Sequence, residues 1–188
     1  MDAQTPAGFV VGPSSANGSL SVAEASRSTP LPTADVKTFL SNHHFRAGYA
    51  RVWTSGKAFF VSTVLELRDG TDATAMLALV RSGFEQLAPA YIEPYPTIPD
   101  GLRYDFNVRK PSGIYQICTG VVFRVQSYVH LVSACDDNPP DGLLVRARAQ
   151  AQYSRTLRLL HDRDSSTGPK AGTAMSSSSM RLQVGSAP

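Results

Sequence analysis

The stretch GIYQICTGVVFRVQSYVHLVSAC, from Gly113 to Cys135, carries the most structural information in the chain. It is the longest run rich in β-branched and aromatic residues, and it holds the only two cysteines, Cys118 and Cys135. This composition is typical of strands. The polar pair Gln126-Ser127 near its middle indicates that the run folds back on itself as a β-hairpin. We therefore expect this hairpin at the centre of a sheet.

A two-residue loop at Gln126-Ser127 determines which residues of the hairpin face each other. Val125 then faces Tyr128 as a hydrogen-bonded pair, and counting outward gives the pairs Phe123/His130, Val121/Val132 and Cys118/Cys135. The cysteines form a non-hydrogen-bonded pair, in which the Cα atoms approach to about 4.5 Å, a separation that a disulfide can bridge. The register predicts a Cys118–Cys135 disulfide. Two free buried thiols are the alternative, because cysteine is among the most buried residue types.

Composition bounds the class of protein. The 188 residues are enough for one domain with a real core, 42% of them are hydrophobic and 18% are charged. The net charge of +3 is too small an excess to indicate a nucleic-acid partner. No run of about 18 apolar residues occurs, so no transmembrane segment is expected.

The N-terminus has neither the charged start nor the apolar block of a secretory signal. Either the protein is cytoplasmic or the sequence begins downstream of a removed signal or anchor. The opposed cysteines favour an oxidising, extracytoplasmic compartment.

The ends of the chain differ from its middle. Residues 1–32 are crowded with Ser, Thr, Ala, Gly and Pro and are expected to form a flexible segment, in which Phe9-Val10-Val11 could add a short edge strand. One folded domain is expected over residues 33–161. Residues 162–188, which include four consecutive serines, are expected to be disordered.

Hydrophobic periodicity within this domain predicts an α+β fold. Helical spacing of apolar residues predicts helices over 34–42, 73–88 and 143–161, and alternation predicts strands over 47–54, 58–67 and 102–108 besides the hairpin. The proline-rich residues 89–99 are expected to form an extended loop. This order predicts an antiparallel sheet of about five strands with helices packed on it.

Two faces are assigned in more detail. On the strand over 58–67, the side chains expected to face the core are Phe59, Val61, Thr63, Leu65 and Leu67. In the last helix, Arg146, Arg148, Arg155 and Arg158 lie off the apolar stripe and are expected to form a solvated face.

Catalytic and cofactor motifs do not stand out in this sequence. It contains no GxSxG elbow, no P-loop and no GxGxxG loop, so we predict neither a catalytic residue nor a nucleotide cofactor. His43 and His44 are adjacent and point to different sides, while His130 and His161 carry no ligand spacing. Metal binding is therefore not expected.

One strand face suggests a ligand site. Tyr49, Arg51 and Trp53 alternate along the strand over 47–54 and so share a face. An arginine between two aromatic rings could hold a small molecule or a peptide through stacking and cation–π contacts. The alternative is that the arginine stem covers aromatic packing, as arginine stems commonly do.

The segment GYARVW (Gly48 to Trp53), followed by an alternating strand, a helix beginning near Asp72 and a Val-Val-Phe…Tyr-Val hairpin, resembles uncharacterised actinobacterial cell-envelope or lipoprotein domains. The resemblance covers about residues 34 to 160, and some domains of this kind are similar to the PsbP-like α/β sandwich. It implies an extracytoplasmic, non-catalytic domain, and it carries over no site residues. The chain shows neither the signal peptide nor the lipobox cysteine of such proteins.

These observations lead to one main functional hypothesis and two alternatives. The main hypothesis is a binding or interaction module of the cell envelope, with an unknown protein or small molecule as its partner. The first alternative is a small hydrolase or lyase with a pocket built from Tyr49, Arg51, Trp53 and a histidine. The second is a cytoplasmic accessory protein that engages partners through its tails.

Overall fold

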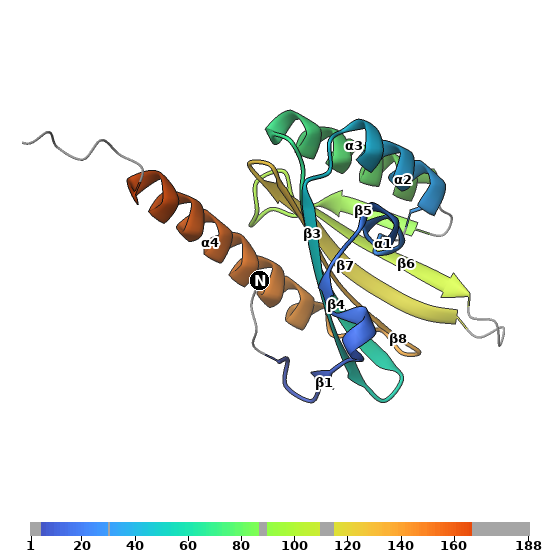
Figure 1. The fold of residues 1–188 in the computed structure, drawn as a ribbon. Coiled ribbons are helices and arrows are strands. Elements are labelled where there is room, and N and C mark those ends of the chain that lie inside the picture. Colours follow the sequence, from blue (N-terminus) through green and yellow to red (C-terminus); the bar gives the residue numbers. More distant parts are fainter. Residues whose placement is uncertain (1–4, 30, 87–89, 110–114, 167–188) are drawn as a thin grey trace, which may run out of the picture.

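A computed structural model describes residues 5–29, 31–86, 90–109 and 115–166. Over these residues the chain forms one antiparallel sheet with helices on both sides (Figure 1). The strands are β1 (Val10–Val11), β2 (Gly18–Ser19), β3 (Ala47–Ser55), β4 (Ala58–Glu66), β5 (Ala90–Pro94), β6 (Leu102–Arg109), β7 (Tyr115–Val125) and β8 (Tyr128–Asp136). The helices are the 3-10 turn η1 (Ser14–Ala16), α1 (Val22–Arg27), α2 (Thr33–Asn42), α3 (Gly70–Gln86) and α4 (Gly142–Ser166). The α+β class is confirmed.

The hairpin β7–β8 lies in the middle of the sheet. The strand order is β1-β3-β4-β8-β7-β6-β5, with β2 also paired to β3. Within the hairpin, Val125 pairs with Tyr128, Phe123 with His130, Val121 with Val132 and Cys118 with Cys135. The central position and the register predicted from the two-residue loop are both confirmed.

Helices cover both faces of the sheet, each with its own hydrophobic core. On one face α2 and α3 contribute Leu40, Met76 and Phe84, which pack with Val122 and Leu131. On the other face α4 contributes Val145 and Ala149, which pack with Trp53, Phe60 and Phe123. Two cores form because neighbouring residues of the central strands, such as Val121 and Val122, are both apolar and point to opposite faces.

The prediction that the strand over 58–67 has a single core face is wrong, because both of its faces contain buried side chains. Thr63, Leu65 and Leu67 are buried as expected, but Phe60 and Ser62 are buried on the opposite face. Phe59 and Val61 are only half-buried, since α3 does not reach that end of the sheet. The strand is therefore covered on both sides over different parts of its length.

The N-terminal segment is the main departure from expectation. Within residues 1–32, expected to be flexible, β1 pairs Val10 with Thr54, β2 pairs Gly18 with Ala50, and α1 begins at a capping box made by Ser21 and Glu24. The alternative of a short edge strand near Phe9 is confirmed by β1. The segment is ordered because β3 offers an open edge of backbone donors and acceptors.

Among the residues that the structure describes, the sheet has eight strands, where about five were expected. Besides β1 and β2, the additional strand is β5, in the proline-rich stretch expected to be a loop. Its Pro94 lies opposite Leu102 at the last pair of an edge strand, where a missing backbone donor is tolerated.

The predicted helices differ from the observed ones mainly at their ends. Helix α2 begins at Thr33, one residue before the predicted start, and α4 continues to Ser166, beyond the predicted end at residue 161. The part of the expected disordered tail beyond residue 166 lies outside the described residues. That residues 33–161 form the domain stays a prediction.

Candidate functional site

A groove of about 710 Å³ lies on the sheet face that carries α1. Its floor consists of rows of side chains that run across neighbouring strands. One row contains Val52, Val61, Ser133, Gly120 and Tyr104, and the next contains Phe59, Cys135, Cys118 and Phe106. The floor of the groove is thus built from strands β3, β4, β6, β7 and β8, which span residues 47 to 136 of the sequence.

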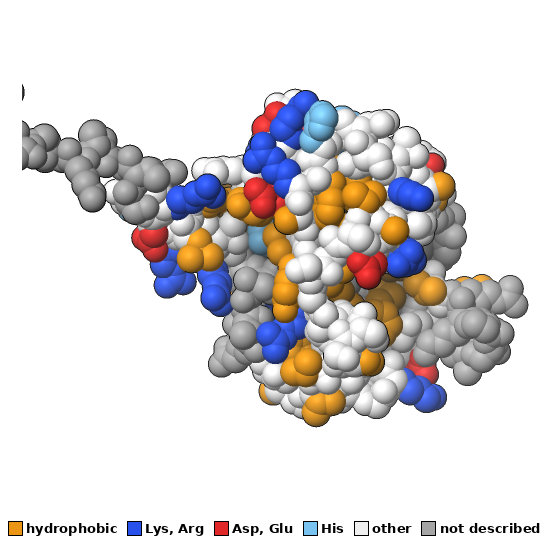
Figure 2. Space-filling model, in the orientation of Figure 1, with side chains coloured by type: hydrophobic (Ala, Val, Ile, Leu, Met, Phe, Trp, Pro, Cys, Tyr) orange, Lys and Arg blue, Asp and Glu red, His pale blue; other side chains and the backbone are white. Residues whose placement is uncertain are grey.

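The wall of the groove is the N-terminal segment. Its lining residues come from η1, β2, α1 and the residues that connect and follow them: Ser15, Ala16, Asn17, Ser19, Leu20, Glu24, Arg27, Ser28 and Thr29. Figure 2 looks onto this side of the molecule, and hydrophobic side chains are visible in a hollow there. The rim carries one acidic and one basic lining residue, Glu24 and Arg27.

Asn17 ties this wall to the sheet. Its amide nitrogen donates to the carbonyl oxygens of Gly12 (3.1 Å) and Pro13 (2.7 Å), and its amide oxygen accepts from the backbone nitrogen of Val52 (2.8 Å). One side chain therefore closes the loop around η1 and fastens it to β3.

The deepest part of the floor depends on a glycine. Tyr104 lies across Gly120, and a Cβ atom at that position would be 2.2 Å from the tyrosine ring. The ring stacks on Phe84 at a centroid distance of 4.5 Å, and its hydroxyl is hydrogen-bonded to Ser133. Because burial raises the pKa of Tyr104, this hydroxyl stays protonated, and the floor is uncharged.

A second hydroxyl lies on the floor without a partner. The Oγ1 atom of Thr63 is buried and has no hydrogen bond within the part of the chain that the structure describes. A buried polar atom without a partner is costly. A ligand with a few polar atoms on an apolar body would suit a floor of this kind.

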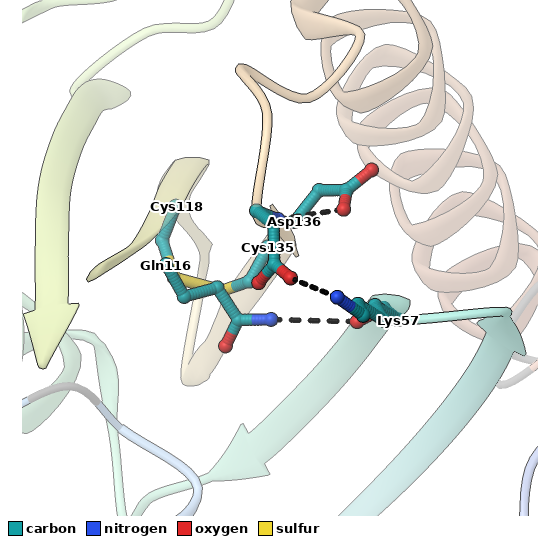
Figure 3. Close-up of a disulfide and its surroundings, with 6 residues drawn as sticks. Lys57, Gln116, Cys118, Cys135 and Asp136 are labelled. Atoms are coloured by element: carbon teal, nitrogen blue, oxygen red, sulfur yellow. Dashed lines mark hydrogen bonds and ion pairs between the residues drawn. A yellow bond between two sulfur atoms is a disulfide. The ribbon is translucent and has the colours of Figure 1, made fainter. Parts of the chain in front are cut away.

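The disulfide is part of the same floor (Figure 3). Cys118 and Cys135 are bonded with their Cα atoms 4.1 Å apart, so the predicted pairing is confirmed and the free-thiol alternative is wrong. Beside it, Gln116 donates to the backbone oxygen of Lys57 (3.4 Å), and the Lys57 amino group lies 3.2 Å from the Asp137 carboxylate. The β3–β4 turn is thereby tied to the open end of the β7–β8 hairpin.

The three residues expected to bind a ligand lie on the opposite face of the sheet. Tyr49, Arg51 and Trp53 pair with Val64, Ser62 and Phe60 of β4 and face α4. Trp53 is 1% exposed, Tyr49 is 38% exposed, and the Arg51 guanidinium lies 5.6 Å from the Trp53 ring centre. The shared face and the cation–π contact agree both with a ligand site and with an arginine stem that covers aromatic packing. Ligand binding by these three residues stays a prediction.

His43 has a partner in the fold. Its Nδ1 atom lies 2.9 Å from Oδ1 of the buried Asp72, and its ring stacks on Phe39 at 4.0 Å. Arg68 also contacts the Asp72 carboxylate, at 3.1 Å. These contacts join the end of α2 to the start of α3. Among the described residues, no three His, Cys, Asp or Glu side chains are placed to hold a metal ion.

The groove itself was not predicted from the sequence. Its residues come from several strands and from a segment expected to be flexible. Small residues at strand positions, such as Ala50, Gly120 and Ser133, are the only local signal, and they mark a hollow only once the strand order is known.

Comparison with known proteins gives little further information. No family model matches the chain, and no curated protein matches it. Among solved structures it is similar to the crystal structure of the extracellular domain of PknH from Mycobacterium tuberculosis, with 9% identity, a TM-score of 0.48, and coverage of 63% of this chain and 69% of that one. A likeness this weak supports no conclusion about function. The expected similarity to PsbP-like domains stays a prediction.

Within the described residues, no helix is both long and apolar enough to cross a membrane.

Proposed function

We propose that the protein is a non-catalytic, extracytoplasmic binding module that holds a small, largely apolar ligand in the groove between its sheet and its N-terminal segment. The observation that carries the proposal is the groove, whose volume of about 710 Å³ lies within the ordinary range of ligand pockets. Its floor is mostly apolar, with several hydroxyl groups and the Gln116 amide as its polar groups, and its two charged lining residues, Glu24 and Arg27, are exposed.

The disulfide in the groove floor supports the proposed compartment. Disulfides form and persist in oxidising environments such as the cell envelope, and reducing systems remove them from most cytosolic proteins. A cell-envelope location is therefore part of the proposal. The hydrolase or lyase and the cytoplasmic accessory protein stay alternatives that no contact among the described residues favours.

The proposal is tested with a variant that fills the groove. Val61 is half-buried on the floor, so Val61→Trp places an indole in the groove. We expect the wild-type protein to bind the neutral apolar dye Nile red, and V61W to bind it at least about tenfold more weakly, since bulk in a pocket excludes a ligand. Fluorescence titration measures both affinities.

Tyr49→Trp is the matched control, because Tyr49 is on the same β3–β4 hairpin but faces α4. Y49W should bind Nile red like the wild type. Equal binding by V61W and wild type would refute the groove as the site. Native mass spectrometry of the protein from its own host should show a bound small molecule and no free thiol; two free thiols would refute the extracytoplasmic assignment.

A further inference from the structure

A second cavity lies on the opposite side of the sheet, under the C-terminal half of α4. It has a volume of about 280 Å³ and is open to solvent at one side. We call it the α4 slot, and its lining residues are Val64, Tyr128, His130, Gln152, Arg155, Thr156, Leu159, Leu160 and Arg163. Nothing in the proposed function depends on it.

Helical spacing explains how α4 forms one side of the slot. Arg155, Leu159 and Arg163 are four residues apart and so follow one line along the flank of the helix. Gln152 and Thr156 lie on the neighbouring line, turned toward the sheet, where Gln152 is buried. The flank line forms the rim of the slot and the inner line forms its back.

The back of the slot is polar but uncharged. His130 is 5% exposed, and its Nε2 atom lies 3.3 Å from the Thr156 hydroxyl. Burial lowers the pKa of His130 to about 4, so the ring is neutral at physiological pH. The Gln152 side-chain amide donates a hydrogen bond to the Ser62 hydroxyl on β4.

The rim, in contrast, is cationic. Arg155 is exposed and makes no ion pair or hydrogen bond with the residues that the structure describes. Arg163 lies two turns further along the same flank, and the lining contains no aspartate or glutamate. Between these arginines and the neutral back, the surface is apolar: Val64, Leu159 and Leu160.

We propose that the α4 slot binds a small hydrophobic carboxylate, with its apolar part against Val64, Leu159 and Leu160 and its carboxylate on Arg155 at the rim. A guanidinium group presents two parallel donors that match a carboxylate. An apolar interior with only cationic groups at its mouth also favours a ligand with an apolar body and one anionic end. A cationic or neutral molecule of the same size lacks this partner for Arg155.

This site is separate from the groove. Val64 and His130 occupy one row of the sheet, with Tyr49 and Phe123, on the face toward α4. The groove rows lie on the other face, so the sheet stands between the two cavities. Either site can fail its test without affecting the other.

Octanoate is the probe, and isothermal titration calorimetry measures its affinity. We expect wild-type protein to bind octanoate with a dissociation constant below about 1 mM, and Arg155→Gln to bind it roughly tenfold more weakly, the usual size of one charge-assisted hydrogen bond. Arg158→Gln is the matched control, because Arg158 is an exposed arginine of the same helix that does not line the slot. R158Q should bind like the wild type, and octylamine should bind more weakly than octanoate.

A second pair of variants tests where the probe binds. Leu159 is 57% exposed and lines the slot, whereas Leu157 is 44% exposed and does not. Leu159→Trp should therefore block octanoate, and Leu157→Trp should not. The proposal is overturned if wild-type protein does not bind octanoate at millimolar concentration, if R155Q and R158Q bind it equally, or if V61W abolishes binding while L159W does not.

Discussion

His130 is an ionisable side chain enclosed by aromatic and helical neighbours. Its ring stacks on Phe123 with a centroid distance of 4.7 Å, and the Thr156 hydroxyl of α4 lies beside it. Its Nδ1 atom is buried and has no hydrogen-bond partner in the described part of the chain. A proton added to this ring would therefore be poorly solvated.

This burial predicts a loss of stability in acid. The pKa of His130 is lowered from 6.5 to about 4 in the folded protein, so between these values the unfolded chain binds a proton that the folded chain does not. Stability then falls as the pH drops through this interval, by roughly 3 kcal/mol in total. Urea unfolding at pH 7.5 and pH 4.5 measures the change.

His130→Phe removes the titrating group and keeps an aromatic ring. Between pH 7.5 and pH 4.5, the free energy of unfolding of this variant should fall by roughly 2 kcal/mol less than that of the wild type. His161→Phe, at an exposed position of α4, should lose as much as the wild type. Equal losses in H130F and wild type would contradict the prediction.

At the scale of elements, the β7–β8 hairpin contains the one disulfide cross-link among the described residues. The disulfide joins residues 17 positions apart, and closing a loop of this length stabilises a folded protein by about 3 kcal/mol. Cys118→Ala/Cys135→Ala should therefore unfold at a lower urea concentration, and so should the wild type in reductant.

The reductant separates the cross-link from the loss of the buried sulfur atoms. It should not change the unfolding of the double alanine variant, which has no disulfide to reduce. If wild-type stability in reductant equals that in its absence while the thiols are shown to be free, the disulfide contributes nothing and the prediction is wrong.

The same hairpin shows why its register could be predicted from sequence. A two-residue loop between strands that are apolar on both faces leaves one pairing, because a shift by one residue would move every side chain to the other face. No comparable indication of the pairing register exists for strands β1, β2 and β5. They are short edge strands with Ser, Gly or Pro within or beside them, and their pairing depends on partners that are distant in sequence.

The candidate site was less predictable for the same physical reason. Tyr49, Arg51 and Trp53 were placed on one face by alternation alone, which is a local property. The groove and the α4 slot arise only when β3 to β8 are assembled and α1 and α4 are laid on opposite faces. Neither the order of strands nor the packing of helices is encoded in a local pattern.

At the scale of the whole molecule, the groove needs the N-terminal segment as its wall. Asn17→Ala removes the hydrogen bonds to Gly12, Pro13 and Val52. We expect the amides of residues 10–20 and of Val52 to exchange with deuterium at least about tenfold faster, because these bonds hold the segment locally. Hydrogen–deuterium exchange followed by mass spectrometry measures the rates.

Ser15→Ala is the control for this variant, since the Ser15 side chain lines the groove but makes no hydrogen bond among the described residues. It should leave the exchange rates unchanged. Unchanged rates in N17A as well would mean that β1 and β2 alone hold the wall, and Nile red binding would then be unaffected.

The pairing of β1 and β2 with β3 has a consequence for association between molecules. An uncovered sheet edge is a template on which another chain can add a strand, and this leads to aggregation. Residues 10–19 occupy that edge of β3 with two short strands separated by a 3-10 turn, so the covering segment is itself too short and too irregular to recruit a neighbour. The wall of the groove therefore also covers the outer edge of β3, and a change that loosens this segment would expose the groove and that edge together.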